Sequence, residues 1–231
     1  MSLKGEIIAY HGWGFDRNCW EQWQEILSSN FQFKTYDRGY FQDEIHPEFT
    51  DNELNKIIFA HSFGLHLCPR EILKKANILI LFNSFSEFHP DNEKSRKRTK
   101  YGLKLMIDDF KNNPKNVLKS FYKKCYYPSP YIETEEQNFN RERLEEDLKL
   151  LNKAKLDINI LEKIPKINMI HGSKDRIFLV SYSQEFYKKV SKNSQYYEIE
   201  DAGHCLPFTH LKSCLSIVNQ TLGEIDNHGD N

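Results

Sequence analysis

Short apolar runs rich in β-branched and aromatic residues recur along the chain and alternate with stretches of helical spacing. Runs of this kind predict buried strands, and the longer amphipathic stretches between them predict helices. The predicted strands cover residues 6–10, 31–36, 56–60, 77–82, 166–170 and 195–199. Strands that alternate with helices are typical of α/β proteins, so we expect a mostly parallel sheet of about six strands flanked by helices.

The helices expected to cover this sheet lie between and after the strands, at residues 15–28, 63–74, 180–190 and 207–222. Asp16 is a candidate N-cap for the first of them, because its side chain can accept a hydrogen bond from the first turn. Pro207 suits the first turn of the last helix, where its missing N–H has no partner to lose.

The stretch from about residue 84 to residue 160 interrupts the alternation, because it is charged, helix-rich and without a clear strand. Leu103, Met106, Ile107 and Phe110 have the spacing of one apolar helix face, and residues 141–155 are also amphipathic. Ligands of open α/β sheets bind at the carboxyl ends of the strands. We therefore expect a core of residues 1–84 and 161–231, and a helical lid of residues 85–160 over that edge.

Composition and charge argue against several classes of protein. A formal net charge of −1 argues against a general nucleic-acid binder, which would be strongly basic. No apolar stretch reaches the roughly 18 residues that span a bilayer, and the first residues lack an apolar signal core. The five cysteines are scattered without a Cys-x-x-Cys pair, which favours reduced thiols in a cytoplasm. We expect a cytoplasmic protein that binds neither nucleic acid nor a membrane.

Ser62 is the first candidate for chemistry. It stands in the segment Ala60-His61-Ser62-Phe63-Gly64, directly after the predicted strand 56–60. A serine hydroxyl becomes a useful nucleophile when a tight strand-to-helix turn presents it and a base takes its proton. Small residues on either side, here Ala60 and Gly64, are what such a turn requires. A helix N-cap is the alternative role for this serine.

Asp175 and His204 follow the predicted strands 166–170 and 195–199, at the same edge of the sheet. A histidine there can accept the serine proton and return it to the leaving group, and an aspartate can hold the imidazole in one tautomer. We therefore predict Ser62 as nucleophile, His204 as base and Asp175 as acid, in that chain order. Asp201 is the alternative acid. A helix-capping Asp175 and a packed His204 are the alternatives without catalysis.

An oxyanion site is predicted beside the serine. The segment His11-Gly12-Trp13-Gly14 follows the first strand, and its glycines let the backbone turn an N–H toward a developing oxyanion. The backbone N–H groups of Trp13 and Phe63 are the candidate donors. The side chains of Trp13, Phe63 and Phe85 are candidates for an apolar acyl pocket, with an ordinary core role as the alternative.

These segments resemble the α/β-hydrolase superfamily over nearly the whole chain, and are most similar to the pimeloyl-acyl-carrier-protein methyl ester esterases of biotin synthesis. The resemblance rests on residues 11–14 with Trp20, on residues 62–64, and on residues 202–210 (AGHCLPFTH). It departs from the family at Ala60, where glycine is usual, and at Leu65, where a second glycine commonly follows. It implies hydrolysis of a methyl ester through an acyl-enzyme, a small acyl ester substrate, and no metal or organic cofactor.

Basic residues gather in the predicted lid, and an acidic acyl carrier protein is the partner that they would attract. A solvated helix face is the alternative. A general carboxylesterase or thioesterase on small acyl substrates is the alternative enzyme, and a non-catalytic ligand-binding protein on a hydrolase scaffold is the alternative of another class. The basic residues are Lys94, Arg96, Lys97, Arg98, Lys100, Lys104, Lys119, Lys123 and Lys124.

Overall fold

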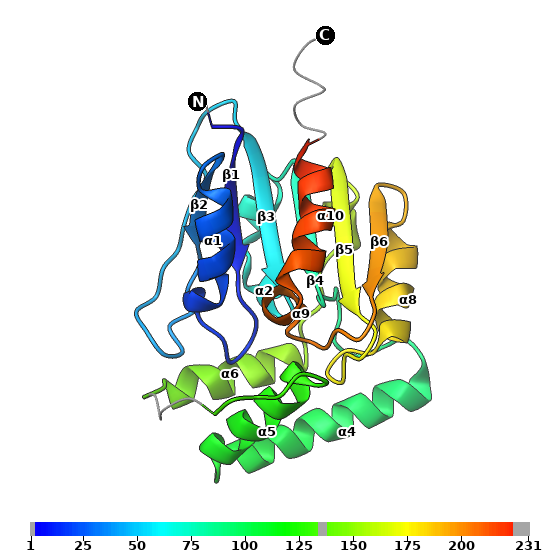
Figure 1. Ribbon diagram of the computed structural model, residues 1–231. Helices are drawn as coiled ribbons and strands as arrows, with labels where there is room; N and C mark the ends of the chain where they lie inside the picture. The colour runs from blue at the N-terminus through cyan, green and yellow to red at the C-terminus, as the bar shows by residue number, and fades with distance from the viewer. Residues whose placement is uncertain (1–2, 134–137, 224–231) are drawn as a thin grey trace.

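One six-stranded parallel sheet forms the centre of the protein, in the strand order β2-β1-β3-β4-β5-β6 (Figure 1). The computed structural model describes residues 3–133 and 138–223. Every pair of neighbouring strands is parallel, which confirms the predicted sheet. The strands are β1 Gly5–Tyr10, β2 Phe31–Thr35, β3 Asn55–His61, β4 Ile78–Phe82, β5 Lys166–Gly172 and β6 Ser194–Ile199.

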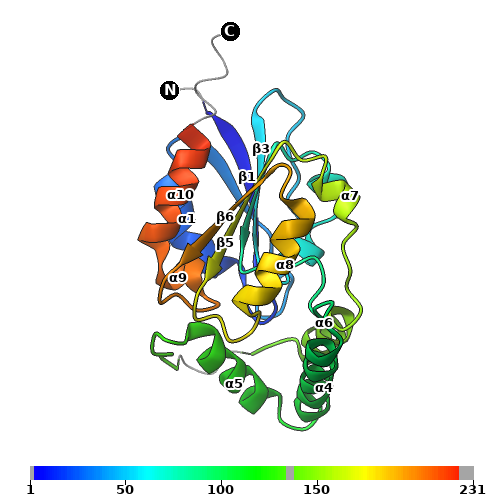
Figure 2. The same cartoon turned by 90° about the vertical axis from the view of Figure 1, so that its right-hand side faces the viewer.

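Helices cover both faces of the sheet (Figures 1 and 2). On one face, Trp23 of α1 and Val218 of α10 pack with Ile7 and Phe59 in one buried cluster. On the other face, α2, α3, α7 and α8 pack against the alternate strand residues. Burial on both faces explains why the strands read as continuous apolar runs. The bounds are α1 Glu21–Leu27, α2 Gly64–Leu67, α3 Arg70–Leu73, α7 Ile158–Leu161, α8 Val180–Val190 and α10 Leu211–Gly223.

The strand order changes direction between β1 and β3. The chain leaves β1 toward β2 on one side and leaves β3 toward β4 on the other. Loops that diverge in this way open a crevice at the carboxyl ends of the two strands, where ligands of such sheets bind. The loop after β1 carries Trp13 and the turn after β3 carries Ser62, so both lie at this point.

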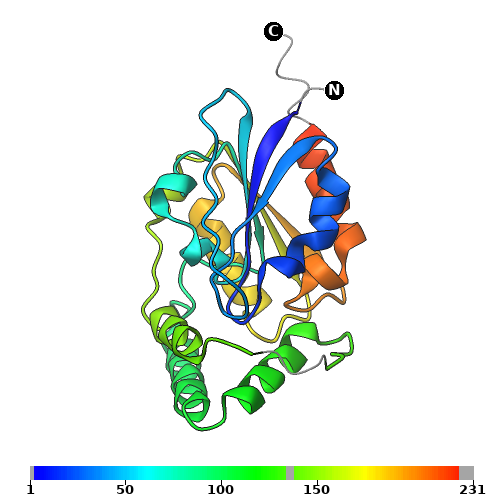
Figure 3. The same ribbon diagram turned by 90° about the vertical axis from the view of Figure 1, so that its left-hand side faces the viewer.

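A helical insertion follows β4, and its described residues form three helices, α4 Glu93–Phe110, α5 Pro114–Tyr126 and α6 Arg141–Leu151. It lies across the carboxyl ends of the strands (Figures 1 and 3). Leu103 and Phe110 are buried, which confirms the predicted apolar face of α4. The sequence pattern did not predict α5. The exact boundaries 1–84, 85–160 and 161–231 stay predictions.

The predicted helix over residues 63–74 is wrong, because the structure has two short helices there. Pro69 has no N–H to donate and pushes the residue before it out of the helical region. Cys68 is accordingly extended, with φ −68° and ψ 121°. Residues 15–28 and 207–222 are likewise divided, into η1 Arg17–Trp20 with α1 and α9 Leu206–Thr209 with α10. Asp16 caps η1 by accepting from the backbone N–H of Asn18.

In the ranges 3–133 and 138–223, no helix has the length and apolar character needed to cross a membrane.

Candidate active site

Ser62 occupies a strained turn between β3 and α2. Its φ of 54° lies in the left-handed region, which non-glycine residues rarely adopt, and residues strained in this way tend to cluster at functional sites. The backbone N–H of Ser62 donates to the Phe82 carbonyl at 2.9 Å and fixes the turn against β4. A Cβ on Gly64 would lie 2.5 Å from the Tyr10 oxygen and 2.8 Å from that of His11. Glycine is therefore required at position 64.

His204 lies between Ser62 and Asp175. Its Nε2 is 2.8 Å from the Ser62 Oγ, and its Nδ1 is 2.7 Å from the Asp175 Oδ2. The carboxylate can only accept, so Nδ1 carries the proton and Nε2 faces the serine hydroxyl as an acceptor. All three side chains are buried. The three residues predicted from separate strand ends are thus brought into one hydrogen-bonded series.

Backbone groups hold the Asp175 carboxylate in place. Its Oδ1 accepts from the N–H groups of Ile177 at 2.7 Å and Phe178 at 3.0 Å. Burial acts to raise the pKa of Asp175, but His204, His171 and the Phe178 N–H outweigh burial and hold the pKa below its ordinary value. Asp201 instead has an exposed side chain 4.0 Å from Lys174, so the structure places Asp175 against the imidazole.

The loop after β1 touches the serine. A Cβ on Gly12 would lie 3.0 Å from the Ser62 Cβ, so only glycine lets the loop approach this closely. Within the described part of the chain, the backbone N–H groups of Trp13 and Phe63 have no hydrogen-bond acceptor. Two free amides beside a serine hydroxyl are the arrangement that an oxyanion site requires.

The predicted acyl-pocket side chains meet in one buried cluster. Trp13, Phe63 and Phe85 are each exposed by 3% or less and pack with side chains from the helical insertion. The Trp13 ring is 4.9 Å from Phe121 of α5 by ring centroids, and its Nε1 donates to the Leu144 carbonyl of α6 at 2.8 Å. The insertion therefore packs on Trp13, in the loop that touches the serine.

Three further buried histidines form hydrogen bonds with backbone groups. His61 Nε2 donates to the His204 carbonyl at 2.9 Å, and burial followed by the neighbouring His204 lowers its pKa to about 3. His171 Nε2 donates to the Phe178 carbonyl at 2.9 Å. His11 Nε2 accepts from the Arg38 N–H at 3.0 Å. None of these three rings is hydrogen-bonded to the serine hydroxyl.

Solved structures share this architecture. An esterase from Exiguobacterium antarcticum matches with a TM-score of 0.76 and 16% identity, covering 96% of this chain and 93% of that one. MenH from S. aureus matches with a TM-score of 0.72 and 13% identity, covering 98% and 96%. A bromoperoxidase from Bacillus anthracis matches with a TM-score of 0.71 and 17% identity, covering 96% and 93%.

The chain has the α/β-hydrolase fold. No protein-family model and no curated protein matches the sequence. At these identities the solved structures establish the fold and leave the reaction open, since one fold serves many chemistries. The narrower resemblance to the pimeloyl esterases stays a prediction.

Sequence reasoning missed the residues that bind the insertion to the α/β-hydrolase core. Arg38 pairs with Asp147 of α6 through Nε–Oδ2 at 2.8 Å and Nη2–Oδ1 at 3.1 Å, and Tyr40 donates to the same carboxylate at 2.7 Å. Asp147 is 1% exposed. An acidic residue in a charged amphipathic helix carries no signal of such a partner.

Sequence reasoning also missed Asn83 and Ser84, which follow β4 and donate to the backbone carbonyls of His204 and Ser62. The sequence did contain an indication of these two residues. A polar pair directly after a buried strand lies at the edge of the α/β-hydrolase sheet where ligands bind.

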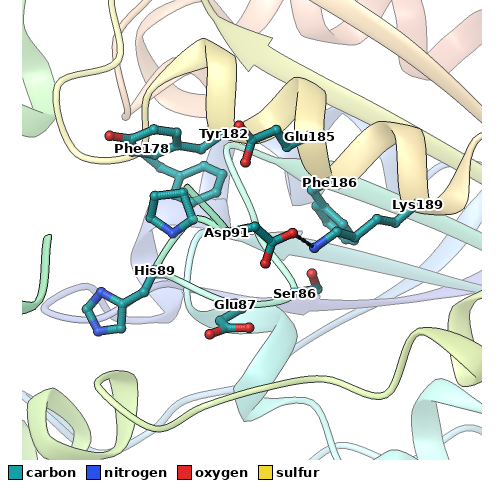
Figure 4. Close-up of a pocket in the computed structure, with 10 residues that line it drawn as sticks. Ser86, Glu87, His89, Asp91, Phe178, Tyr182, Glu185, Phe186 and Lys189 are labelled. Atoms are coloured by element: carbon teal, nitrogen blue, oxygen red, sulfur yellow. Dashed lines mark hydrogen bonds and ion pairs between the residues drawn. The ribbon is translucent and has the colours of Figure 1, made fainter. Parts of the chain in front are cut away.

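A shallow hollow lies between the segment after β4 and helix α8 (Figure 4). Its lining includes Glu87, His89 and Tyr182, and Asp91 pairs with Lys189 across it at 2.6 Å. Ser62, Asp175 and His204 do not line it. The hollow is therefore separate from the three candidate catalytic residues.

Proposed function

We propose that the protein is a serine-dependent carboxylic ester hydrolase, with Ser62 as nucleophile, His204 as general base and Asp175 as acid. The observation that carries the proposal is the hydrogen-bonded series from Ser62 through His204 to Asp175. The left-handed backbone of Ser62 supports it, since strain at a presented serine has no evident structural purpose. Esterases among the structural neighbours are consistent with it.

The geometry supports a two-step acyl transfer. The Ser62 oxygen attacks the ester carbonyl while His204 Nε2, 2.8 Å away, takes the hydroxyl proton. The imidazolium that forms is stabilised by the Asp175 carboxylate at 2.7 Å. His204 then gives the proton to the leaving alkoxide and an acyl-enzyme remains. Water activated by His204 hydrolyses this intermediate and restores the serine.

The free backbone N–H groups of Trp13 and Phe63 are the proposed oxyanion donors. Each would face the carbonyl oxygen as its negative charge develops in the tetrahedral intermediate. Loss of one such donor typically costs about 3 kcal/mol of transition-state stabilisation. The apolar cluster around Trp13 keeps water away, which strengthens these interactions.

Hydrolysis of p-nitrophenyl esters of short acids tests the proposal. The wild type is expected to release p-nitrophenol, and Ser62→Ala is expected to lose activity by about 10⁴-fold or more. Ser213→Ala is the matched control, because Ser213 is exposed on α10 on a face of the core. Activity that survives in Ser62→Ala would contradict the assignment. A wild type inert toward every ester would favour the non-catalytic binding protein.

The finer assignment that we propose is demethylation of a pimeloyl-acyl-carrier-protein methyl ester. Its support is the outward face of α4, where the cationic side chains of Lys94, Arg98 and Lys104 are exposed. In the described ranges these three make no ion pair. A cationic face on the insertion would steer an acidic carrier to the site beneath.

A specific observation favours the alternative, an esterase for free small acyl substrates. Arg96 pairs with Glu87, and Lys119 pairs with Glu133 at 2.6 Å, so part of the predicted basic surface is neutralised. The triple variant Lys94→Glu/Arg98→Glu/Lys104→Glu separates the two assignments. Carrier recruitment predicts that methanol release from the loaded carrier falls while hydrolysis of the free methyl ester is unchanged. Equal effects on the two substrates would favour the small-substrate esterase.

A further inference from the structure

Two consecutive polar residues, Asn83 and Ser84, follow strand β4 beneath the proposed catalytic residues. They are buried, with exposures of 1% and 2%. Asn83 has a φ of 47°, in the left-handed region where asparagine is one of the few tolerated residues. Buried polar side chains in folded proteins are nearly always hydrogen-bonded, so the partners of these two residues are informative.

Both the nitrogen and the oxygen of the Asn83 side-chain amide are hydrogen-bonded. Its Nδ2 donates to the carbonyl of Gly203 at 2.9 Å and to that of His204 at 2.7 Å. Its Oδ1 accepts from the Gly172 N–H at 2.9 Å. One side chain thus joins the loop that carries the base to the strand end that precedes the acid.

Ser84 makes a similar contact with the backbone of Ser62, the proposed nucleophile. Its Oγ donates to the Ser62 carbonyl at 2.7 Å. Adjacent residues therefore hold the backbones of Ser62 and His204, whose side chains meet at 2.8 Å. His61 adds a second donor to the His204 carbonyl at 2.9 Å.

We propose that Asn83 is a positioning residue that sets the alignment of the His204 imidazole with the Ser62 hydroxyl, assisted by Ser84. This inference rests on the proposed function. Asparagine meets the demands of the position better than the two other residues that favour a left-handed backbone, aspartate and glycine. Aspartate would set a carboxylate against two carbonyl oxygens, and glycine would keep the left-handed backbone but lose the three hydrogen bonds.

The test compares Asn83→Gly and Asn83→Asp with the wild type in steady-state hydrolysis of a p-nitrophenyl ester. Both residues tolerate a left-handed backbone, so the fold is expected to survive. A misplacement of about 1 Å lowers catalysis by about 100-fold, so kcat should fall by that order while KM changes little. Asn168→Ala is the matched control, because Asn168 is also buried but bonds to Thr221 within the core.

A second readout follows the imidazole itself. The proton between His204 Nδ1 and Asp175 Oδ2 is expected to give a low-field NMR resonance. We expect this resonance to move or broaden in Asn83→Gly and to stay in place in Asn168→Ala. Ser84→Ala should give a smaller loss of kcat, because it removes one hydrogen bond where Asn83→Gly removes three.

The failures of the two proposals are distinguishable. Wild-type kcat and an unmoved resonance in both Asn83 variants, with Ser62→Ala inactive, would overturn the positioning role alone. A raised KM with unchanged kcat would also overturn it. Hydrolysis that persists in Ser62→Ala would overturn the proposed function on which it rests.

Discussion

The carboxyl edge of the sheet and the helical insertion above it are held in different ways. At the edge, backbone groups and buried amides fix each residue of the site, as Asn83 does for His204 and Phe82 does for Ser62. The insertion is held by apolar packing and a few side-chain contacts, such as Arg38 with Asp147. Backbone hydrogen bonds demand one geometry, whereas apolar packing tolerates rearrangement when volume is conserved. The edge is therefore suited to fix the chemistry, and the insertion to select the substrate.

Among the variants that compare the edge with the insertion, Gly64→Ala at the edge is expected to have the largest effect on activity. The added Cβ would lie 2.5 Å from the Tyr10 carbonyl oxygen, which belongs to β1 and cannot easily move. Overpacking of this kind costs roughly 1–3 kcal/mol and should shift the Ser62 turn, so kcat should fall by about 100-fold or more. Ester hydrolysis and thermal unfolding measure the two effects. Full activity in this variant would show that the turn is not rigid.

The next effect is expected where the insertion meets the core, from Asp147→Ala. Removing one member of a buried ion pair typically costs 3–5 kcal/mol, and the 23% exposure of Arg38 favours the lower end, about 3 kcal/mol. Chemical denaturation measures the loss. Glu145→Ala breaks a partly exposed pair with Lys149 in the same helix, with side chains 18% and 54% exposed, and should cost less than about 1 kcal/mol. Equal losses in the two variants would contradict a specific tie between α6 and the core.

A third prediction concerns pH and the opposite end of the sheet. Glu6 is buried and accepts hydrogen bonds from Lys34 and Lys56, each at 2.8 Å. Burial acts to raise its pKa, but the two lysines outweigh burial and hold the pKa well below the ordinary 4.5. Because the folded pKa is lowered, the stabilisation is complete above pH 4.5 and is lost as the pH falls toward the folded value.

Glu6→Gln should therefore lower the free energy of unfolding by about 2 kcal/mol at pH 7. The difference from the wild type should shrink as denaturation is repeated below pH 4.5. A difference that is constant across this range would show that the charge of Glu6 is not involved.

The smallest effect is expected within the insertion, from Gly102→Ala. Gly102 lies inside α4, and a Cβ there would meet no atom within 4 Å. Alanine should stabilise the helix by about 1 kcal/mol and leave ester hydrolysis unchanged. Compared with Gly64→Ala, this variant makes the same chemical change in the other region. A loss of activity would show that the insertion takes part in catalysis.

Sequence reasoning predicted the carboxyl edge of the sheet better than the insertion, because the features of that edge lie in contiguous residues. Strand ends, a small-residue turn around Ser62 and the residues that follow β5 and β6 are all read from contiguous residues. Asp175 was chosen over Asp201 in this way, and the structure sets it against His204. The break at Pro69 was also local, and was missed because the apolar spacing continues through it.

The contacts of the insertion depend on distant pairs, which a single sequence does not reveal. Asp147 lies 109 residues from Arg38, and Leu144 lies 131 residues from Trp13. The Asn83 side chain reaches His204 across 121 residues. In each case the residue type was visible but the partner was not, so the roles emerged only from the fold.

The most direct test of the central claim is covalent labelling with a fluorophosphonate, followed by mass-spectrometric location of the adduct. A serine activated by its histidine reacts, whereas other serine hydroxyls remain poor nucleophiles. The account predicts one adduct, on Ser62, and little labelling in His204→Ala. No adduct on the wild type, or an adduct on another residue with Ser62 unmodified, would contradict it.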